Sequence, residues 1–304
     1  GRPSYARVLR GFGLSAVGLA NNHTFDFGTP GLRDTVAALD EAGLPWTGAG
    51  ENERDARRPL VLDAAGRRVA FLTVAEHEYS YALPDRIGVW GFDPFETMED
   101  IAEARKTADY VIVLYHGGKE QCRYPSPRLR RACQAMVRAG ADFVVCQHSH
   151  CIGVYEEYRR AGILYGEGNF NFVGYLEHPH WLHGLLLELN EEDGRLVPTF
   201  HPLRVTDTGV TLDEGESRER ELRELDERSR LLLDDEAWMR EWHAFCESMR
   251  PSYRESIARA FRDNDTEVPA EIFPHYLDCE AHTDVWRELY PTWHRAATDE
   301  QGSF

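Results

Sequence analysis

The strongest constraint on the fold of this chain comes from three short apolar runs. Each of them is followed directly by residues of the kind that bind metals. They are residues 14–20 before Asn21-Asn22-His23, residues 110–115 before His116-Gly117-Gly118, and residues 143–147 before His148-Ser149-His150. Each run has the length and the β-branched or aromatic content of a buried strand. Loops beyond the carboxyl ends of parallel strands share one crevice. We therefore expect these Asn and His side chains to meet.

The chemistry of this set favours a divalent metal. Imidazole nitrogen and amide oxygen suit Zn, Mn or Fe, and two such ions about 3.5–4 Å apart can clamp a phosphoryl group and activate water. His148 and His150 could bind two different ions or one. If Asn22 gives its amide oxygen to a metal, His23 remains for proton donation or charge stabilisation. A single His after a strand, or a single Asn-Asn-His, is more often an ordinary loop or turn, so only the combination carries weight.

Alternation of strand-like and helix-like segments predicts the fold of residues 1–214. Strands are expected at 14–20, 44–47, 61–63, 69–75, 110–115, 143–147, 154–158, 163–165, 185–189 and 197–205, and helices at 32–42, 53–58, 94–108 and 126–139. This order is typical of an α/β sandwich with a largely parallel centre and antiparallel additions. From 215 to 304 the pattern is helical and rich in aromatic residues. We expect a C-terminal extension that packs on the first domain through these aromatics.

Composition excludes several kinds of partner. The formal net charge is −18, which argues against nucleic acid or an anionic membrane surface because either needs a basic patch. An acidic substrate needs local Arg groups or bound cations. No apolar run approaches the ~20 residues of a membrane helix. The six cysteines form no CxxC pair, so we expect buried thiols. Cys146 and Cys151 flank His148-Ser149-His150, and zinc ligation by them is the alternative.

Five segments together resemble a known family. They are Ala20-Asn21-Asn22-His23-Thr24-Phe25-Asp26-Phe27-Gly28 (A-N-N-H-x-x-D-x-G), Trp46-Thr47-Gly48-Ala49-Gly50 (the "GaG" turn), His116-Gly117-Gly118-Lys119-Glu120 (H-W-G-x-E), residues 140–150 (G-A-D-x-V-x-x-H-x-H) and Tyr165-Gly166-Glu167-Gly168-Asn169-Phe170 (Y-s-x-G-N-F). Their order over residues 5–210 resembles the CapA, or PGA_cap, branch of the calcineurin-like metallophosphoesterases. The resemblance implies a metallophosphoesterase-like αββα sandwich.

The resemblance also implies roles for particular residues. Asn22, His116 and His148 would bind one metal and His150 the other, while His23 would act as acid or charge stabiliser. Asp26 would assist catalysis, although capping the following turn is an equal alternative. Substrate-facing positions would be Glu120, Arg123, Tyr124 and Asn169. Residues 120–127 could equally be a rigid connection. Glu78, or Glu76, lies beyond a predicted strand end and would support a ligand His, as would Glu167; the alternative is a solvated loop.

Two departures from the family pattern affect the metal site. Gln147 stands where the superfamily has Gly in G-H-x-H. The earlier motifs G-D and N-L-E, which supply a bridging carboxylate, do not occur, and we expect them upstream of Gly1. The cluster His178-Pro179-His180-Trp181-Leu182-His183 is another source of metal ligands or, alternatively, a mobile polar loop.

The implied function is that of a CapA-like metal-dependent hydrolase or phosphatase in bacterial capsule or poly-γ-glutamate biosynthesis. It would use a dinuclear Mn, Zn or Fe centre in the full-length protein, with metal-bound hydroxide as the nucleophile. Partners would be capsule or polyglutamate synthase components and an acidic polymer, in the bacterial cytoplasm or cell envelope. The alternative is a non-catalytic metal- or polymer-binding accessory module of a capsule synthase.

Overall fold

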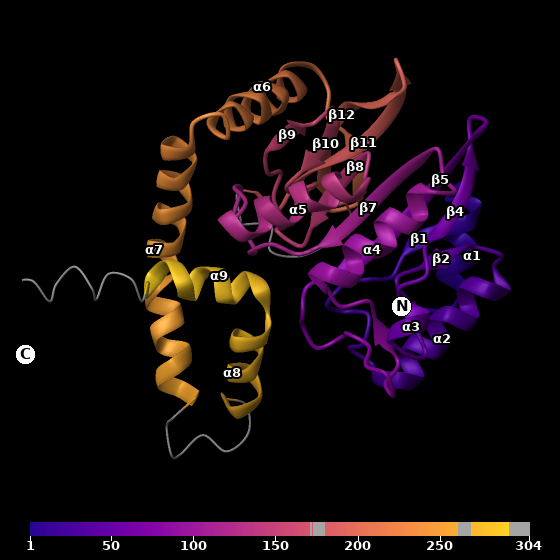
Figure 1. Ribbon diagram of the computed structural model, residues 1–304, viewed down its shortest axis with the longest axis horizontal. Coiled ribbons are helices and arrows are strands. Elements are labelled where there is room, and N and C mark those ends of the chain that lie inside the picture. Colours follow the sequence, from indigo (N-terminus) through magenta and orange to yellow (C-terminus); the bar gives the residue numbers. More distant parts are fainter. Residues whose placement is uncertain (171, 173–179, 261–268, 292–304) are drawn as a thin grey trace, which may run out of the picture.

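The centre of the molecule is a six-stranded mixed sheet (Figure 1). The computed structural model of the chain describes residues 1–170, 172, 180–260 and 269–291. In spatial order the strands are β4 (Leu60–Ala64), β5 (Arg67–Ala75), β7 (Tyr110–His116), β8 (Phe143–Gln147), β10 (Ala161–Leu164) and β9 (Tyr155–Tyr158). The four inner strands are parallel, whereas β4 and β9 pair antiparallel at the edges. The predicted α/β fold with a parallel centre is therefore confirmed.

Side chains of the inner strands alternate between two apolar faces. Along β7, Val111 and Val113 lie in one buried cluster, while Tyr110 and Ile112 lie in another on the opposite face. Burial on both faces is usual for parallel strands. The first face is covered by α4 (Pro94–Arg105) and α5 (Pro127–Ala139). Both helices begin with a side-chain cap followed by Pro at the first position, which satisfies the free N–H groups there.

A second β layer covers the other face of the central sheet. One part is the antiparallel sheet of β11 (His183–Glu192), β12 (Arg195–Thr206) and β13 (Gly209–Leu212), and the other is the parallel pair β1 (Val17–Gly18) and β2 (Trp46–Thr47). Leu185 and Phe200 pack with Ile112 and Phe143 between the layers. Two helices lie outside this layer, α2 (Gly28–Glu41) and α6 (Gly215–Leu231). Helices therefore flank two β layers, as the αββα expectation requires.

The first predicted strand is much shorter than expected. Residues 14–20 were expected to be extended, but only Val17–Gly18 pair, because β2 can pair over only two residues. Before β2 stands Pro45, which has no N–H for a ladder. After it Gly48 turns at φ +89°, and a Cβ on Gly48 would lie 1.8 Å from Thr73 Oγ1 of β5. Close contact between the two β layers thus requires glycine and ends the strand.

Three further elements of the first ninety residues differ from the sequence expectation. Helix α1 (Ser4–Gly11) was not predicted. The expected turn around Gly48 includes β3 (Ala49–Gly50), which pairs with β6 (Gly88–Val89). The short helix α3 covers Glu53–Ala56 and ends before Arg57.

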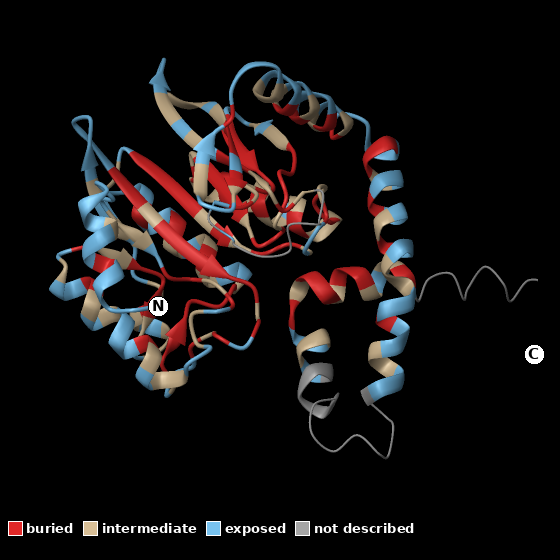
Figure 2. Cartoon of the chain, turned by 180° about the vertical axis from the view of Figure 1, so that it is seen from behind, coloured by how far each residue is buried: buried red, intermediate tan, exposed pale blue. Residues whose placement is uncertain are grey.

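Three C-terminal helices lie together at one side of the central sheet (Figure 1). They are α7 (Asp235–Ala260), α8 (Pro269–Asp278) and α9 (Glu280–Leu289). Trp242 and Tyr253 of α7 form a buried cluster with Val285 of α9 and Cys122, which comes from the loop after β7. Figure 2 shows that α9 is largely buried. Trp293, one of the aromatic residues expected to pack here, lies outside the described residues. None of the helices in these described ranges is long and apolar enough to cross a membrane.

Candidate metal site

Three donor atoms from the two β layers converge at the carboxyl end of the central sheet. β7 and β8 are in register with His116 opposite Gln147, so the next residue, His148, lies beside His116. Asn22 follows β1 in the other layer. Asn22 Oδ1 lies 3.0 Å from His116 Nε2, which lies 3.2 Å from His148 Nδ1. The structure thus brings together the three residues that were expected to share one metal.

These distances fit a single ion. When ligand atoms bind at about 2.0–2.2 Å, neighbouring ligand atoms are about 3 Å apart. Burial lowers the pKa of His116 well below its ordinary value, so its ring is neutral and can bind a metal. Burial alone would also lower the pKa of His148, but its hydrogen bond to Glu78 raises that pKa above the ordinary value.

Glu78 holds two of the three donors from behind. Its Oε2 accepts from Asn22 Nδ2 at 2.7 Å, and its Oε1 lies 3.2 Å from His148 Nε2. Burial raises the pKa of Glu78, but the hydrogen bonds from His148 and Asn22 outweigh this and leave the pKa well below its usual range. A carboxylate that accepts from the second nitrogen of a ligand His fixes its tautomer and its orientation.

Glu76, the other carboxylate considered at this strand end, faces a different region. It is buried and accepts from Tyr115 OH at 3.0 Å and from Gly118 N at 3.1 Å, and it pairs with Arg128. A Cβ on Gly117 would lie 2.7 Å from Glu76 Cδ. Glycine at 117 therefore lets the chain pass over Glu76, which belongs to the packing beneath the site.

His150 lies apart from the three donor atoms. Its Nδ1 is 2.8 Å from Asn169 Oδ1, and its ring stacks on Trp181 with centroids 4.3 Å apart. The ring centroids of His148 and His150 are 6.2 Å apart.

The backbone of this loop is strained. His148 and His150 have φ of +93° and +56°. Positive φ is uncommon for residues other than Gly and clusters at functional sites. The positive φ falls on His148 and not on Gln147, whose side chain instead donates to Glu167 Oε2 at 2.9 Å. Burial raises the pKa of Glu167, which makes no hydrogen bond to the three donors among the described residues.

His23 lies at the exposed side of the site. Its Nδ1 is 3.0 Å from Asp26 Oδ2, and the two side chains are 68% and 49% exposed. The buried ligand candidate Asn22 precedes it directly. The set therefore combines a covered group of donors with an accessible histidine whose ring is held by a carboxylate.

In the segment 120–127, Cys122, Pro125 and Ser126 contact α7 or α9, whereas Gln121 N donates to Ser149 O. Arg123 Nε donates to Ile152 O at 3.3 Å and Arg123 Nη2 lies 3.8 Å from Glu224, while Tyr124 packs against the core. Glu120 remains half exposed, with Oε2 3.9 Å from Lys119 Nζ. Among the described residues, the structure does not bring Arg123 or Tyr124 into contact with the three donors.

Other sets of metal ligands are less suitable. Cys146 Sγ lies 3.5 Å from Cys133 Sγ in the buried core, away from the three donor atoms, and burial raises the pKa values of Cys146 and Cys151. His178 lies outside the described residues. Within the described ranges, no group of three or more His, Cys, Asp or Glu side chains is placed to hold a metal ion. The described residues thus bring together Asn22, His116 and His148 as candidate donors for one ion, while His150, expected to bind the other ion, lies apart from them.

Two residues that contact the site region come from a part of the chain with no motif. Cys279 Sγ lies 3.4 Å from Glu78 Oε1, and Glu280 binds His77. Both lie about two hundred residues from their partners, and no sequence pattern indicated them.

Comparison with known proteins identifies the family. Residues 1–173 match the family described as "Bacterial capsule synthesis protein PGA_cap". That range includes Asn22, His116, His148 and Glu78, but not α6–α9.

Named relatives agree with this match. The chain is 36% identical over 172 residues to the capsule biosynthesis protein CapA of Bacillus anthracis, covering 55% of this chain and 42% of that protein. It is 32% identical over 170 residues to the PGA biosynthesis protein CapA of Bacillus subtilis, covering 55% and 44%. It is 38% identical over 164 residues to a "probable polyglutamine synthesis accessory protein" of Mycobacterium tuberculosis, covering 50% and 43%. The match thus spans less than half the length of these relatives. The chain belongs to the PGA_cap family of bacterial capsule synthesis proteins.

Proposed function

We propose that this chain holds the metal of a metal-dependent, phosphoesterase-type hydrolase that acts in the synthesis of a bacterial capsule polymer such as poly-γ-glutamate. The observation that carries the hydrolase proposal is the convergence of Asn22 Oδ1, His116 Nε2 and His148 Nδ1 at 3.0 and 3.2 Å. The capsule context is supported by the family match and by the names of the Bacillus relatives.

Each residue has a distinct part in this proposal. Asn22, His116 and His148 would hold a divalent ion, which when bound polarises a phosphoryl oxygen and lowers the pKa of water. Glu78 holds the amide of Asn22 and the ring of His148 in place. Asp26 accepts from His23 Nδ1–H and would stabilise the imidazolium form of the ring, in which Nε2 carries the proton for a leaving group. The proposed role of these residues concerns one ion, and no step is assigned to a second.

Hydrolysis of p-nitrophenyl phosphate and bis-p-nitrophenyl phosphate with Mn²⁺ or Zn²⁺ tests the proposal. We expect metal-dependent turnover that falls by about 10²-fold or more in His23→Ala, because general acid catalysis contributes that much. His201→Ala is the matched control, since His201 is a partly exposed histidine paired with Glu188 on the β11–β12 sheet, away from the site. It should retain full activity. Equal rates in wild type and His23→Ala, or no metal-dependent rate in wild type, would contradict the proposal.

A non-catalytic accessory role is the second candidate. The word "accessory" in the name of the Mycobacterium relatives favours it. Retention of the chain by immobilised poly-γ-glutamate, together with no turnover of either phosphoester, would support this role in place of hydrolysis.

A further inference from the structure

The N-terminal end of α9 contacts the residue that orders the metal donors. Cys279 immediately precedes α9, and its Sγ lies 3.4 Å from Glu78 Oε1, the same oxygen that faces His148. Cys279 and Glu78 are both buried. A shift of this end of α9 therefore changes the surroundings of the Glu78 carboxylate directly.

Other residues of the loop after β5 contact α8 and the start of α9. Glu280 accepts twice from His77, with Oε2 2.8 Å from the backbone N and Oε1 2.7 Å from Nδ1. Tyr79 stacks on His275 with ring centroids 4.6 Å apart. Tyr81 OH donates to Asp278 Oδ2 at 3.0 Å. Residues 77, 78, 79 and 81 thus all contact the segment 275–280.

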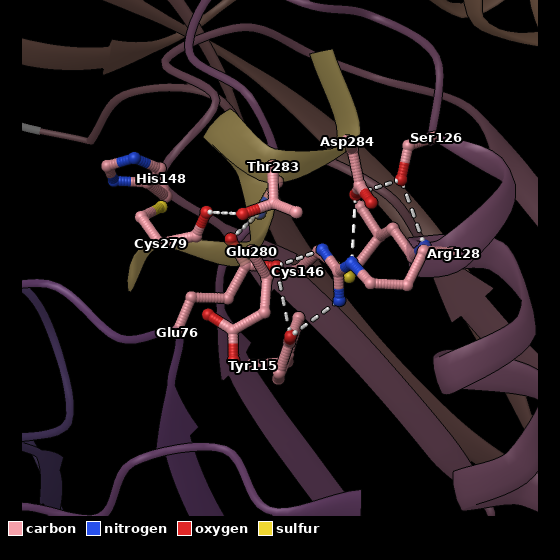
Figure 3. Close-up of polar contacts among 12 residues, drawn as sticks. Glu76, Tyr115, Ser126, Arg128, Cys146, His148, Cys279, Glu280, Thr283 and Asp284 are labelled. Atoms are coloured by element: carbon pink, nitrogen blue, oxygen red, sulfur yellow. Dashed lines mark hydrogen bonds and ion pairs between the residues drawn. The ribbon is translucent and has the colours of Figure 1, made fainter. Parts of the chain in front are cut away.

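A buried network fixes α9 from its other side. Asp284 accepts from Ser126 Oγ at 2.5 Å and from Arg128 Nε at 2.8 Å, and Arg128 also binds Glu76 and Tyr115 (Figure 3). Glu76 begins the same loop, and its backbone N donates to His116 O at 2.9 Å. The helix is therefore tied to α5 and to both ends of the segment 76–78.

We propose that α9, which lies outside the region matched by the family, positions the metal donors through Glu78, with Glu280 and Cys279 as positioning residues. Glu280 fixes the path of the loop at His77. Cys279 fixes the position of the Glu78 oxygen that faces His148. The inference rests on the proposed metal function. The C-terminal extension thus contributes to the site through residues that lie outside the shared motifs.

Glu280→Gln tests the role of the loop anchor. A glutamine has one acceptor oxygen, so one of the two hydrogen bonds from His77 is lost together with the negative charge. Substitution of a residue that supports a metal ligand typically lowers the metal affinity about 10- to 100-fold. Because Glu280 acts one residue further out, we expect Mn²⁺ affinity, measured by calorimetry, to fall by about 3- to 10-fold.

Glu288→Gln is the matched control on the same helix. Glu288 accepts from Trp242 Nε1 at 3.2 Å and pairs with His243, both on α7, so the substitution removes the same kind of contact on a side that does not face the loop. It should keep Mn²⁺ affinity within about twofold of wild type, well below the effect of a supporting residue.

Cys279 provides a rescue test. Cys279→Ala removes the donor to Glu78 and should lower Mn²⁺ affinity, whereas Cys279→Ser retains a donor and should restore it at least partly. A purely structural role of the buried thiol would make the polar Ser at least as harmful as Ala.

Hydrogen exchange of the metal-free chain gives a readout independent of metal binding. Amides of residues 77–81 should exchange faster in Glu280→Gln than in wild type and Glu288→Gln. Unchanged exchange and unchanged Mn²⁺ affinity in Glu280→Gln would overturn the positioning role alone. Failure of the wild-type chain to bind Mn²⁺ would instead overturn the proposed function on which it rests.

Discussion

Glu78 and Glu76 are two residues apart, yet they occupy different surroundings. Glu76 turns toward Arg128 and Tyr115, whereas Glu78 holds Asn22 and His148. The sequence placed both at a strand end and left open which of them would support a ligand. The choice depends on the loop's path, which Gly117 permits and α9 fixes.

Glu78→Gln should weaken metal binding strongly. A glutamine that accepts from His148 turns its NH₂ toward the NH₂ of Asn22, which forces Asn22 to turn its oxygen away from His116. We expect Mn²⁺ affinity, measured by calorimetry, to fall by about 10- to 100-fold.

Glu167→Gln is the control for this substitution. Glu167 is mostly buried and accepts from Gln147 without contacting the described donors. An equal loss of affinity in both variants would show that Glu78 has no special role.

The sequence was most informative for residues fixed by strand ends. His116 and His148 meet because β7 and β8 are parallel neighbours in register. Arg123 and Tyr124 were predicted to face substrate, and that role stays a prediction. The structure turns both toward the core and α6. A loop has no periodicity from which the direction of its side chains can be predicted.

Elements with two buried faces could be predicted nearly to the residue. Expected strands at 110–115 and 143–147 correspond to Tyr110–His116 and Phe143–Gln147. The expected strand at 14–20 shrinks to Val17–Gly18 because its length depends on its partner. Apolar content indicates that a segment is buried. It does not indicate over how many residues a neighbouring strand can pair with that segment.

The anchor between the loop after β5 and α9 should depend on pH. Although burial opposes it, the hydrogen bond to Glu280 raises the pKa of His77, and the charges of Glu280, Asp278 and Glu76 act in the same direction. A raised pKa means that the pair stabilises the fold fully below the ordinary pKa of about 6.5 and loses this as pH rises through the raised value.

Urea unfolding at several pH values measures this effect. Because His77 is 30% exposed, we expect the free energy of unfolding attributable to the pair to fall by no more than about 1 kcal/mol above pH 6.5. His77→Gln should remove this part of the pH dependence. The same pH dependence in His77→Gln and wild type would show that the pair does not contribute.

Over the whole molecule, the buried network around Arg128 joins the extension to the αββα domain. Arg128 pairs with Glu76 after β5 and with Asp284 on α9, and both carboxylates are less than a tenth exposed. The boundary near 215 was predicted from a change of pattern. The contacts across it were not, because they join residues over 150 positions apart.

Arg128→Met should destabilise the chain by about 3–5 kcal/mol, because it leaves two buried carboxylates without their cation. Arg230→Met removes an exposed pair with Asp226 and should cost less than about 1 kcal/mol. Urea unfolding of both variants measures the difference. Similar losses in the two would mean that the network does not stabilise the docking of the extension.

Metal binding to the purified chain tests the central claim most directly. Titration with Mn²⁺ or Zn²⁺ should show one ion bound per wild-type chain, and His116→Ala and His148→Ala should each abolish that binding, while His201→Ala leaves it intact. Wild-type stoichiometry and affinity in both His116→Ala and His148→Ala would contradict the account.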